Sequence, residues 1–421
     1  MEKEESNKPI MPPIETVELP ELPRDILMNI FARLEIPDLV RASSVRPSWR
    51  SVYTSLLNLG KYKRSQTPCL LYTSESAGEN VACLYSIAEK RVYKVSLPEP
   101  PICSRLLIGS SQGLLVTVDE RSEMHIVNPI TSEQVDLPSV ITIEQVKPVY
   151  DDSGALRKYR YSRHTAKEVY SPPMIVELDE LREMLHYKAF VFPNTTTGQY
   201  IVVLFHNPHR QLSFTRVGDD SWTWLPPRLH YEDCLYKDGL LYAVNYDGEI
   251  DVYDLSGPTV TMQIVLGMTD AITYSCMYIV QAPWGDLLQV WKSYKDYELH
   301  PEPGAFVFWN TGKFEIYEID IERGERKKVK CLHDHALFLG HNQSLCISSV
   351  EYPALKRNHA YFTDDSYFWT RGFENNSRDI AILNLDNNIR EELVSPQLWS
   401  DFPAPMWITL DVRAMDSALK K

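Results

Sequence analysis

Hydrophobic positions follow two different periods along the chain. Between residues 19 and 57 they recur every three to four residues, as in LPRDILMNIFARL (22–34), whereas between 67 and 395 they alternate in short runs separated by turn residues. A period near 3.6 is typical of a helix that buries one side, and a period of two is typical of a half-buried strand. The pattern predicts a small helical domain, residues 19–60, followed by a large β-domain, residues 67–395.

Prolines divide the helical stretch into short pieces. Pro37 and Pro47 can each end one helix and open the next, so three helices are expected, near 24–34, 37–45 and 47–57. The first helix carries two adjoining apolar stripes, made of Ile26, Ile30 and Leu34 and of Leu27, Phe31 and Leu34. A unit of about 40 residues has too small a core to hide both stripes. The surplus apolar face therefore packs either on the downstream domain or on another chain.

The order of residue types in this stretch resembles an F-box. The matching segments are LPxDILxxIFxxL (22–34), DLxR (38–41), SV (44–45) and WR (49–50), with Arg46 at a position where the family often has cysteine. The resemblance implies docking on the Skp adaptor of a cullin–RING ubiquitin ligase. By position, it assigns adaptor binding to Leu22, Pro23, Ile26, Leu27, Ile30, Phe31 and Leu34, and the core of the F-box to Leu39, Val45 and Trp49.

The β-domain is built from repeats. Segments 113–138, 198–226, 238–260 and 285–319 each begin with Gly or Asp-Gly and continue with short strands, and weaker copies cover 68–98 and 335–394. Copies follow one another at about 40–50 residues, the repeat length of a four-stranded propeller blade. The expected fold is mainly β, a kelch-like β-propeller of about six blades behind the helical domain. Five or seven blades, and a pair of β-sandwiches, remain alternatives.

Two segments of the β-domain and one segment beyond it resemble a plant family in which an F-box precedes a KIB-type domain. They are GSSQGLLV (109–116), LHDHALFLGHNQSLCISSVEYPALKRNHAYFTDD (332–365) and WSDFPAPMWI (399–408). This resemblance spans nearly the whole chain and agrees with the F-box pattern at its start. It implies a plant protein whose propeller holds a partner protein.

Three segments stand outside the repeats. Residues 1–18 are acidic and poor in apolar side chains, which predicts a disordered tail, and residues 396–421 are interpreted as a C-terminal tail. Residues 145–174 contain the basic and aromatic run RKYRYSRH (157–164). We interpret it as a loop in a flexible insertion between blades, and if it binds anything, an acidic protein segment fits better than DNA.

Composition narrows the class of protein further. The formal charge is −14, from 43 basic and 57 acidic residues, which argues against nucleic acid as the partner. The seven cysteines form no CxxC pair, and no apolar stretch is long enough for a membrane span. The first 30 residues hold no apolar run of signal-peptide length. We therefore expect a cytoplasmic or nuclear protein with no membrane association and no cofactor.

Patterns that suggest catalysis or metal binding are weak. Gly109-x-Ser111-x-Gly113 fits a nucleophile motif, but a strand rather than a helix follows it, so a turn is expected. Cys331, His333 and His335, with His341 and Cys346 nearby, match no established zinc spacing. The pairs Asp219-Asp220 and Asp364-Asp365 stand in turn contexts. No catalytic residue and no metal site are predicted.

These observations favour a non-enzymatic receptor. The leading hypothesis is the substrate-recognition subunit of an SCF-type ubiquitin ligase, bound to the Skp adaptor and cullin scaffold and holding an unknown target protein. The alternative is a propeller protein that binds or sequesters its target without ligase assembly; a propeller hydrolase is the least favoured. Aromatic residues near turns are candidate target contacts: Trp222, Trp284 and, as the strongest, Trp369.

Overall fold

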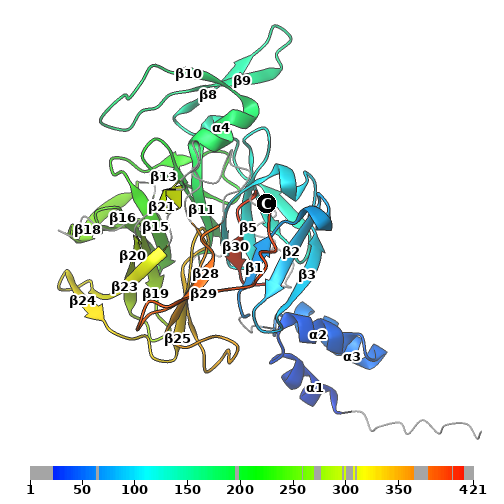
Figure 1. Ribbon diagram of the computed structural model, residues 1–421. Helices are drawn as coiled ribbons and strands as arrows, with labels where there is room; N and C mark the ends of the chain where they lie inside the picture. The colour runs from blue at the N-terminus through cyan, green and yellow to red at the C-terminus, as the bar shows by residue number, and fades with distance from the viewer. Residues whose placement is uncertain are drawn as a thin grey trace, which may run out of the picture. The chain divides into compact units, whose positions relative to one another are not determined.

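The chain folds into two compact units. The computed structural model describes residues 22–62, 66–194, 199–257, 259–269, 276–295, 298–299, 307–308, 311–364, 378–400 and 402–411. Contacts divide the chain into Met1–Arg64 and Ser65–Lys421 (Figure 1). The boundary falls in the interval 60–67 that separates the two predicted domains. The acidic tail predicted for residues 1–18 lies outside the described residues.

Three helices make up the first unit, as predicted: α1 (Arg24–Phe31), α2 (Ile36–Ser43) and α3 (Pro47–Asn58). Proline stands in the first turn of α2 and of α3, where its missing N–H costs no helical hydrogen bond. The Trp49 ring meets the Phe31 ring edge-on, with centroids 5.7 Å apart. The Tyr62 hydroxyl donates to the Leu34 carbonyl at 2.8 Å. Such contacts stabilise helices that are too short to persist alone.

The second unit is a six-bladed β-propeller. Its described residues contain five four-stranded sheets and one five-stranded sheet. The first three blades comprise β1 (Cys69–Tyr72), β2 (Val81–Ser86) and β3 (Arg91–Ser96) with β30 (Met406–Ile408); β4 (Leu106–Ser111), β5 (Leu114–Val118), β6 (Met124–Asn128) and β7 (Glu133–Asp136); and β11 (His186–Pro193), β12 (Tyr200–His206), β13 (Gln211–Arg216) and β14 (Thr223–Trp224).

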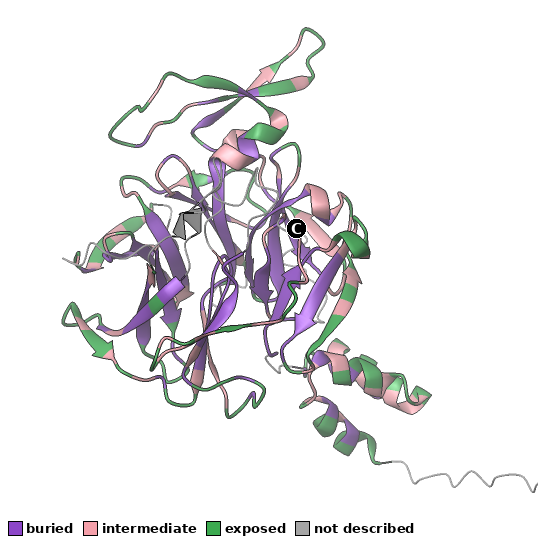
Figure 2. Ribbon diagram, in the orientation of Figure 1, coloured by how far each residue is buried: buried purple, intermediate pink, exposed green. Residues whose placement is uncertain are grey.

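The remaining blades follow in chain order. They comprise β15 (Tyr231–Lys237), β16 (Leu240–Asn245), β17 (Ile250–Asp254) and β18 (Thr261–Leu266); β19 (Cys276–Gln281), β20 (Leu287–Tyr294), β23 (Thr311–Asp320) and β24 (Glu325–Val329); and β25 (His335–Leu339), β26 (Leu345–Ser348), β27 (His359–Phe362), β28 (Ala381–Asn384) and β29 (Arg390–Glu392). A short hairpin, β21 (Glu298–Leu299) and β22 (Val307–Phe308), is inserted in the fifth blade. Figure 2 shows burial concentrated in these blades.

The last strand closes the ring. β30 pairs antiparallel with β1, with Trp407 opposite Leu70. The Trp407 side chain is buried against the rings of Phe338 and Tyr361, with centroids 5.1 and 6.2 Å away. The interpretation of residues 396–421 as a tail is therefore wrong for 406–408. A strand of three residues is too short to show a period in the sequence, although it completes the first blade.

The repeats were predicted at the correct spacing but out of phase by one strand. Asp238-Gly239 lies between β15 and β16, the first and second strands of the fourth blade. Gln112-Gly113 lies between β4 and β5, the first and second strands of the second blade. All four residues have positive φ, at 52° and 85° for the first pair and 52° and 80° for the second. Two consecutive positive φ angles define the tight turn preferred in two-residue hairpins. The Gly and Asp-Gly signals thus mark the first hairpin of a blade rather than its beginning.

Residues 146–185 form an insertion between the second and third blades. It contains a three-stranded antiparallel sheet, β8 (Val146–Tyr150), β9 (Leu156–Tyr161) and β10 (Met174–Glu177), and the helix α4 (Leu178–Leu185). Tyr159 and Tyr161 are buried, whereas Lys158 and Arg160, which alternate with them along the strand, are exposed. The loop predicted at 157–164 is therefore wrong for residues 157–161, which belong to β9. Their alternation of basic and aromatic residues is the period of a strand.

Candidate functional site

An apolar face of the helical unit is exposed to solvent. Ile26 and Ile30, one turn apart on α1, have 44% and 42% of their surface exposed, and Leu22 just before the helix has 47%. Leu27 and Phe31, on the adjoining stripe, are buried. One helix therefore uses one stripe for the core of its own unit and presents the other. Among the remaining predicted adaptor contacts, Pro23 is exposed and Leu34 is half-buried.

The three residues assigned to the F-box core differ in burial. Leu39 is fully buried and Trp49 is half-buried against Phe31. Val45 is 61% exposed, so its assignment to the core is wrong. It lies in the turn between α2 and α3, where no helix face directs it inward.

The two candidate tryptophans that the structure describes, Trp222 and Trp284, differ in exposure. Trp222 is only 6% exposed and belongs to the core cluster shared by the second and third blades and the insertion. Its indole N–H donates to the Pro138 carbonyl at 2.9 Å. Its assignment to target binding is therefore wrong: a turn before an aromatic residue does not decide which face the ring takes. Trp284 is 48% exposed, with its ring centroid 4.9 Å from that of His335. Trp369 lies outside the described residues.

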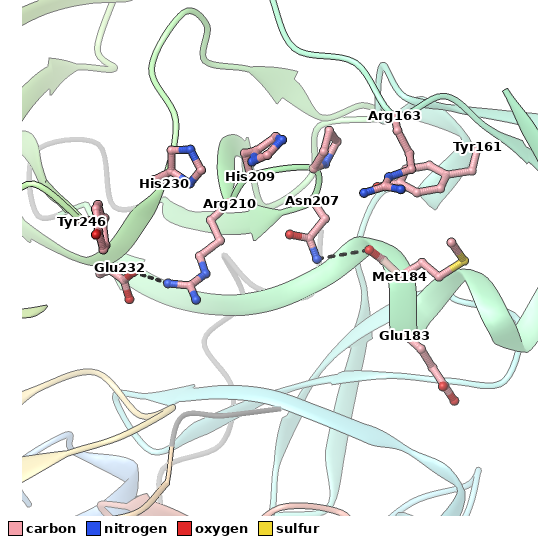
Figure 3. A pocket seen from close by; sticks show the side chains of 11 residues that line it. Tyr161, Arg163, Glu183, Met184, Asn207, His209, Arg210, His230, Glu232 and Tyr246 are labelled. Carbon is pink, nitrogen blue, oxygen red and sulfur yellow. Dashed lines mark hydrogen bonds and ion pairs between the residues drawn. The ribbon is translucent and has the colours of Figure 1, made fainter. Parts of the chain in front are cut away.

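A pocket of about 640 Å³ lies where the insertion meets the third and fourth blades (Figure 3). It was not predicted, because its walls come from distant segments: the end of β9, α4, the turn after β12, the start of β15 and the end of β16. The lining residues are Tyr161, Arg163, Glu183, Met184, Asn207, Pro208, His209, Arg210, His230, Glu232 and Tyr246.

The two histidines of the pocket are held side by side. The rings of His209 and His230 meet edge-on with centroids 4.9 Å apart. The ring of Tyr170, from the insertion, has its centroid 4.3 Å from that of His209. Burial, followed by the nearby His209 and Arg210, lowers the pKa of His230. His230 is therefore neutral at pH 7 and offers one N–H donor.

The two carboxylates of the pocket are engaged elsewhere. Glu232 is buried and forms an ion pair with Arg210, whose guanidinium also lies over the Tyr187 ring, 4.5 Å from its centroid. Figure 3 shows the Glu183 carboxylate pointing away from the histidines. The Asn207 amide, which donates to the Met184 carbonyl at 3.1 Å, ties the turn after β12 to α4. The inner pocket thus presents hydrogen-bond donors and aromatic rings.

The catalytic-looking motif in β4 is a structural hairpin, as predicted. The Ser111 hydroxyl donates to the Val191 carbonyl at 2.9 Å and accepts from the Val191 N–H at 2.7 Å. It therefore joins the inner strands β4 and β11. Asp219 likewise caps its own turn, accepting from the Arg216 N–H at 3.2 Å.

The cysteine and histidine side chains near β25 do not converge on one point. The Cys331 thiol accepts from the His333 backbone N–H at 3.2 Å, and burial raises the pKa of the Cys346 thiol to about 12. In the part of the chain that the structure describes, no three His, Cys, Asp or Glu side chains converge as metal ligands would. No helix among the described residues has the length and apolarity to cross a bilayer.

The fold and the helical module define an F-box protein with a β-propeller. An F-box domain model matches residues 19–56, and the KIB1-4 beta-propeller model matches residues 84–384. The chain belongs to the KIB1-4 β-propeller family. This confirms the resemblance seen in the sequence.

Known relatives match most of the chain. F-box only protein 7 of Arabidopsis thaliana is 26% identical over 81% of this chain and 82% of its own length. F-box protein KIB4 of the same plant is 23% identical, with 82% of each chain covered. Among solved structures, the β-propeller domain of Myceliophteria thermophila Cps50 (Swd1) is similar at 8% identity and a TM-score of 0.29, covering 63% of this chain and 87% of that domain.

Proposed function

We propose that this chain is the substrate-recognition subunit of an SCF-type ubiquitin ligase, with the helical unit binding the Skp adaptor and the propeller binding a target protein. The observation that carries the proposal is the exposed apolar face of Leu22, Ile26 and Ile30. Three large apolar side chains on so small a unit favour a protein partner. The F-box match over residues 19–56 supports the Skp adaptor as that partner.

In this proposal the chain performs no bond chemistry of its own. By holding target and ligase together, it raises the local concentration of target lysines near the catalytic subunits of the ligase. The proposal includes a cytoplasmic or nuclear location. The seven cysteines form no disulfide with one another, which fits the reducing conditions of those compartments.

The test is adaptor capture by an Ile30→Asp variant. A carboxylate in the centre of an apolar contact costs several kcal/mol unless it is paired, so we expect capture of a purified Skp adaptor to be lost while the melting temperature is unchanged. The matched control is Ile264→Asp. Ile264 is 49% exposed on β18 of the propeller, and its replacement should leave capture intact.

Two results would reject the proposal in different ways. Full adaptor capture by Ile30→Asp would show that the apolar face is not the adaptor site. Adaptor capture without co-purification of a cullin would favour the alternative, a propeller protein that holds its target outside a ligase.

A further inference from the structure

Two turns in the wall of the pocket beside the insertion are joined by backbone hydrogen bonds. His209, Arg210 and His230 have positive φ angles of 63°, 48° and 62°. Such angles are uncommon for residues other than glycine, and strained backbone of this kind clusters at functional sites. The His230 N–H donates to the His209 carbonyl at 2.6 Å, and the Tyr231 N–H donates to the Arg210 carbonyl at 3.1 Å. The two turns therefore lock each other and fix the histidine pair.

In the described part of the chain, some basic side chains near the pocket form ion pairs and others do not. On the strand leading to it, Arg157 pairs with Asp151 and Lys158 pairs with Glu177. Arg160 and Arg163 are exposed, and among the described residues neither has a carboxylate partner. Arg163 lines the pocket, whereas Arg160 lies on the opposite face of the sheet from the buried Tyr159 and Tyr161. Arg163 is thus an available cation at a donor-rich pocket.

Charge complementarity identifies the chemistry of the ligand. The chain as a whole carries −14, whereas the pocket presents the Arg163 cation beside hydrogen-bond donors. A carboxylate accepts hydrogen bonds both from a guanidinium, such as that of Arg163, and from imidazole N–H groups. Exposed Tyr246 and Tyr170 at the pocket offer flat faces to the neighbouring side chains of a peptide.

We propose that this pocket receives an acidic side chain, Asp or Glu, of an extended segment of the target protein. The inference rests on the proposed function, because it names the target-reading site of the same receptor. The carboxylate lies against Arg163 and the histidine pair, and the flanking residues of the segment lie on the tyrosines. The insertion and the blades then form the recognition surface together.

The test uses the full chain, purified without adaptor or cullin, and a bead-displayed library of random octapeptides. We expect selected peptides to be enriched in Asp or Glu, and a fluorescein-labelled member to bind about tenfold more weakly to Arg163→Glu, since one charge-assisted hydrogen bond is worth about one decade in affinity. Arg160→Glu is the matched control, because it changes the charge equally three residues away on the opposite face. It should bind within about twofold of the parent.

Three outcomes would overturn the inference. One is a library selection without acidic enrichment, and another is an equal loss of binding in the Arg163→Glu and Arg160→Glu variants. The third is displacement of the labelled peptide by a single-stranded oligonucleotide more strongly than by its unlabelled form. A second variant, Tyr246→Ala, keeps all charges and should weaken binding while preserving the melting temperature.

This experiment is independent of ligase assembly. Arg163→Glu should retain full adaptor capture, and Ile30→Asp should retain full peptide binding. Failure of the peptide result with intact adaptor capture rejects only the pocket, whereas the reverse rejects only the ligase role.

Discussion

The helix α1 exposes apolar side chains to solvent, whereas the inner strands of the propeller bury charged ones. α1 leaves Ile26 and Ile30 in solvent, while the inner strands β11 and β15 bury a lysine and an aspartate, Lys188 and Asp233, with Nζ and Oδ1 3.4 Å apart. Burial raises the pKa of Asp233, and Lys188 opposes that rise. Asp233 Oδ2 also accepts from the Ser344 hydroxyl at 2.6 Å.

The difference separates a complete unit from an incomplete one. A buried ion pair persists only where its polar groups are satisfied internally, as Asp233 is. An exposed apolar stripe has no such compensation within the helical unit. The propeller therefore satisfies this buried ion pair internally. The helical unit leaves an apolar face uncovered, and that face favours binding to a partner. Four substitutions test this contrast, from the largest expected effect on stability to the smallest.

Breaking the buried pair should have the largest effect. Asp233→Ala leaves the Lys188 ammonium buried opposite a methyl group, which should lower the free energy of unfolding by about 3–5 kcal/mol. Urea unfolding followed by tryptophan fluorescence measures the loss. The double variant Lys188→Met with Asp233→Leu removes both charges and should recover most of it. A single variant as stable as the parent would show that the pair is not needed in the core.

Close packing of the inner strands gives the second prediction. A Cβ added at Gly109 of β4 would lie 1.8 Å from the backbone carbonyl oxygen of Ala189 on β11. Gly109→Ala must therefore separate two inner strands, at a cost of about 1–3 kcal/mol or more. Gly267→Ala is the control, because no atom lies within 4 Å of its Cβ position. Equal melting temperatures for the two variants would contradict the close approach of β4 and β11.

Buried histidines give the third prediction, a dependence on pH. Burial lowers the pKa of His186 to about 3 and that of His206 to about 4, whereas a histidine in the unfolded chain titrates near 6.5. Between these values the unfolded chain binds more protons, so stability falls as the pH falls. Each histidine contributes about 1.4 kcal/mol per pH unit. His206→Gln should therefore reduce the slope by that amount between pH 5.5 and 4.5, measured against the parent chain, and an unchanged slope would contradict the burial of His206.

Local patterns in the sequence predicted the fold well. The 3.6-residue period and the two prolines predicted the three helices, and the repeat spacing predicted six blades. The phase of the repeat was wrong because Asp238-Gly239 marks a hairpin inside a blade. The sequence does not predict the strand β30, because its pairing with β1 joins residues more than 330 positions apart.

The site was harder to predict because it depends on contacts between distant segments. Arg163, His209 and His230 line one pocket only because the insertion packs beside the third and fourth blades. No spacing in the sequence reveals that arrangement. Trp222 was placed at the surface from its neighbours in sequence, whereas its burial depends on the core shared with the insertion. By contrast, the apolar face of α1 could be predicted, because its residues follow one another on a single helix.

The smallest effect on stability is expected on the exposed side of α1. Ile26→Ser removes a side chain that is 44% exposed, so the free energy of unfolding should change by no more than about 0.5 kcal/mol. Leu27→Ser, one position further on the same helix, empties the core of the helical unit and should cost about 2–5 kcal/mol. Hydrogen exchange of the α1 amides measures both variants without interference from the propeller. A loss for Ile26→Ser as large as that for Leu27→Ser would mean that the exposed stripe packs on another part of this chain. The surplus apolar face would then be an internal contact, and the contrast between an incomplete helical unit and a complete propeller would fail.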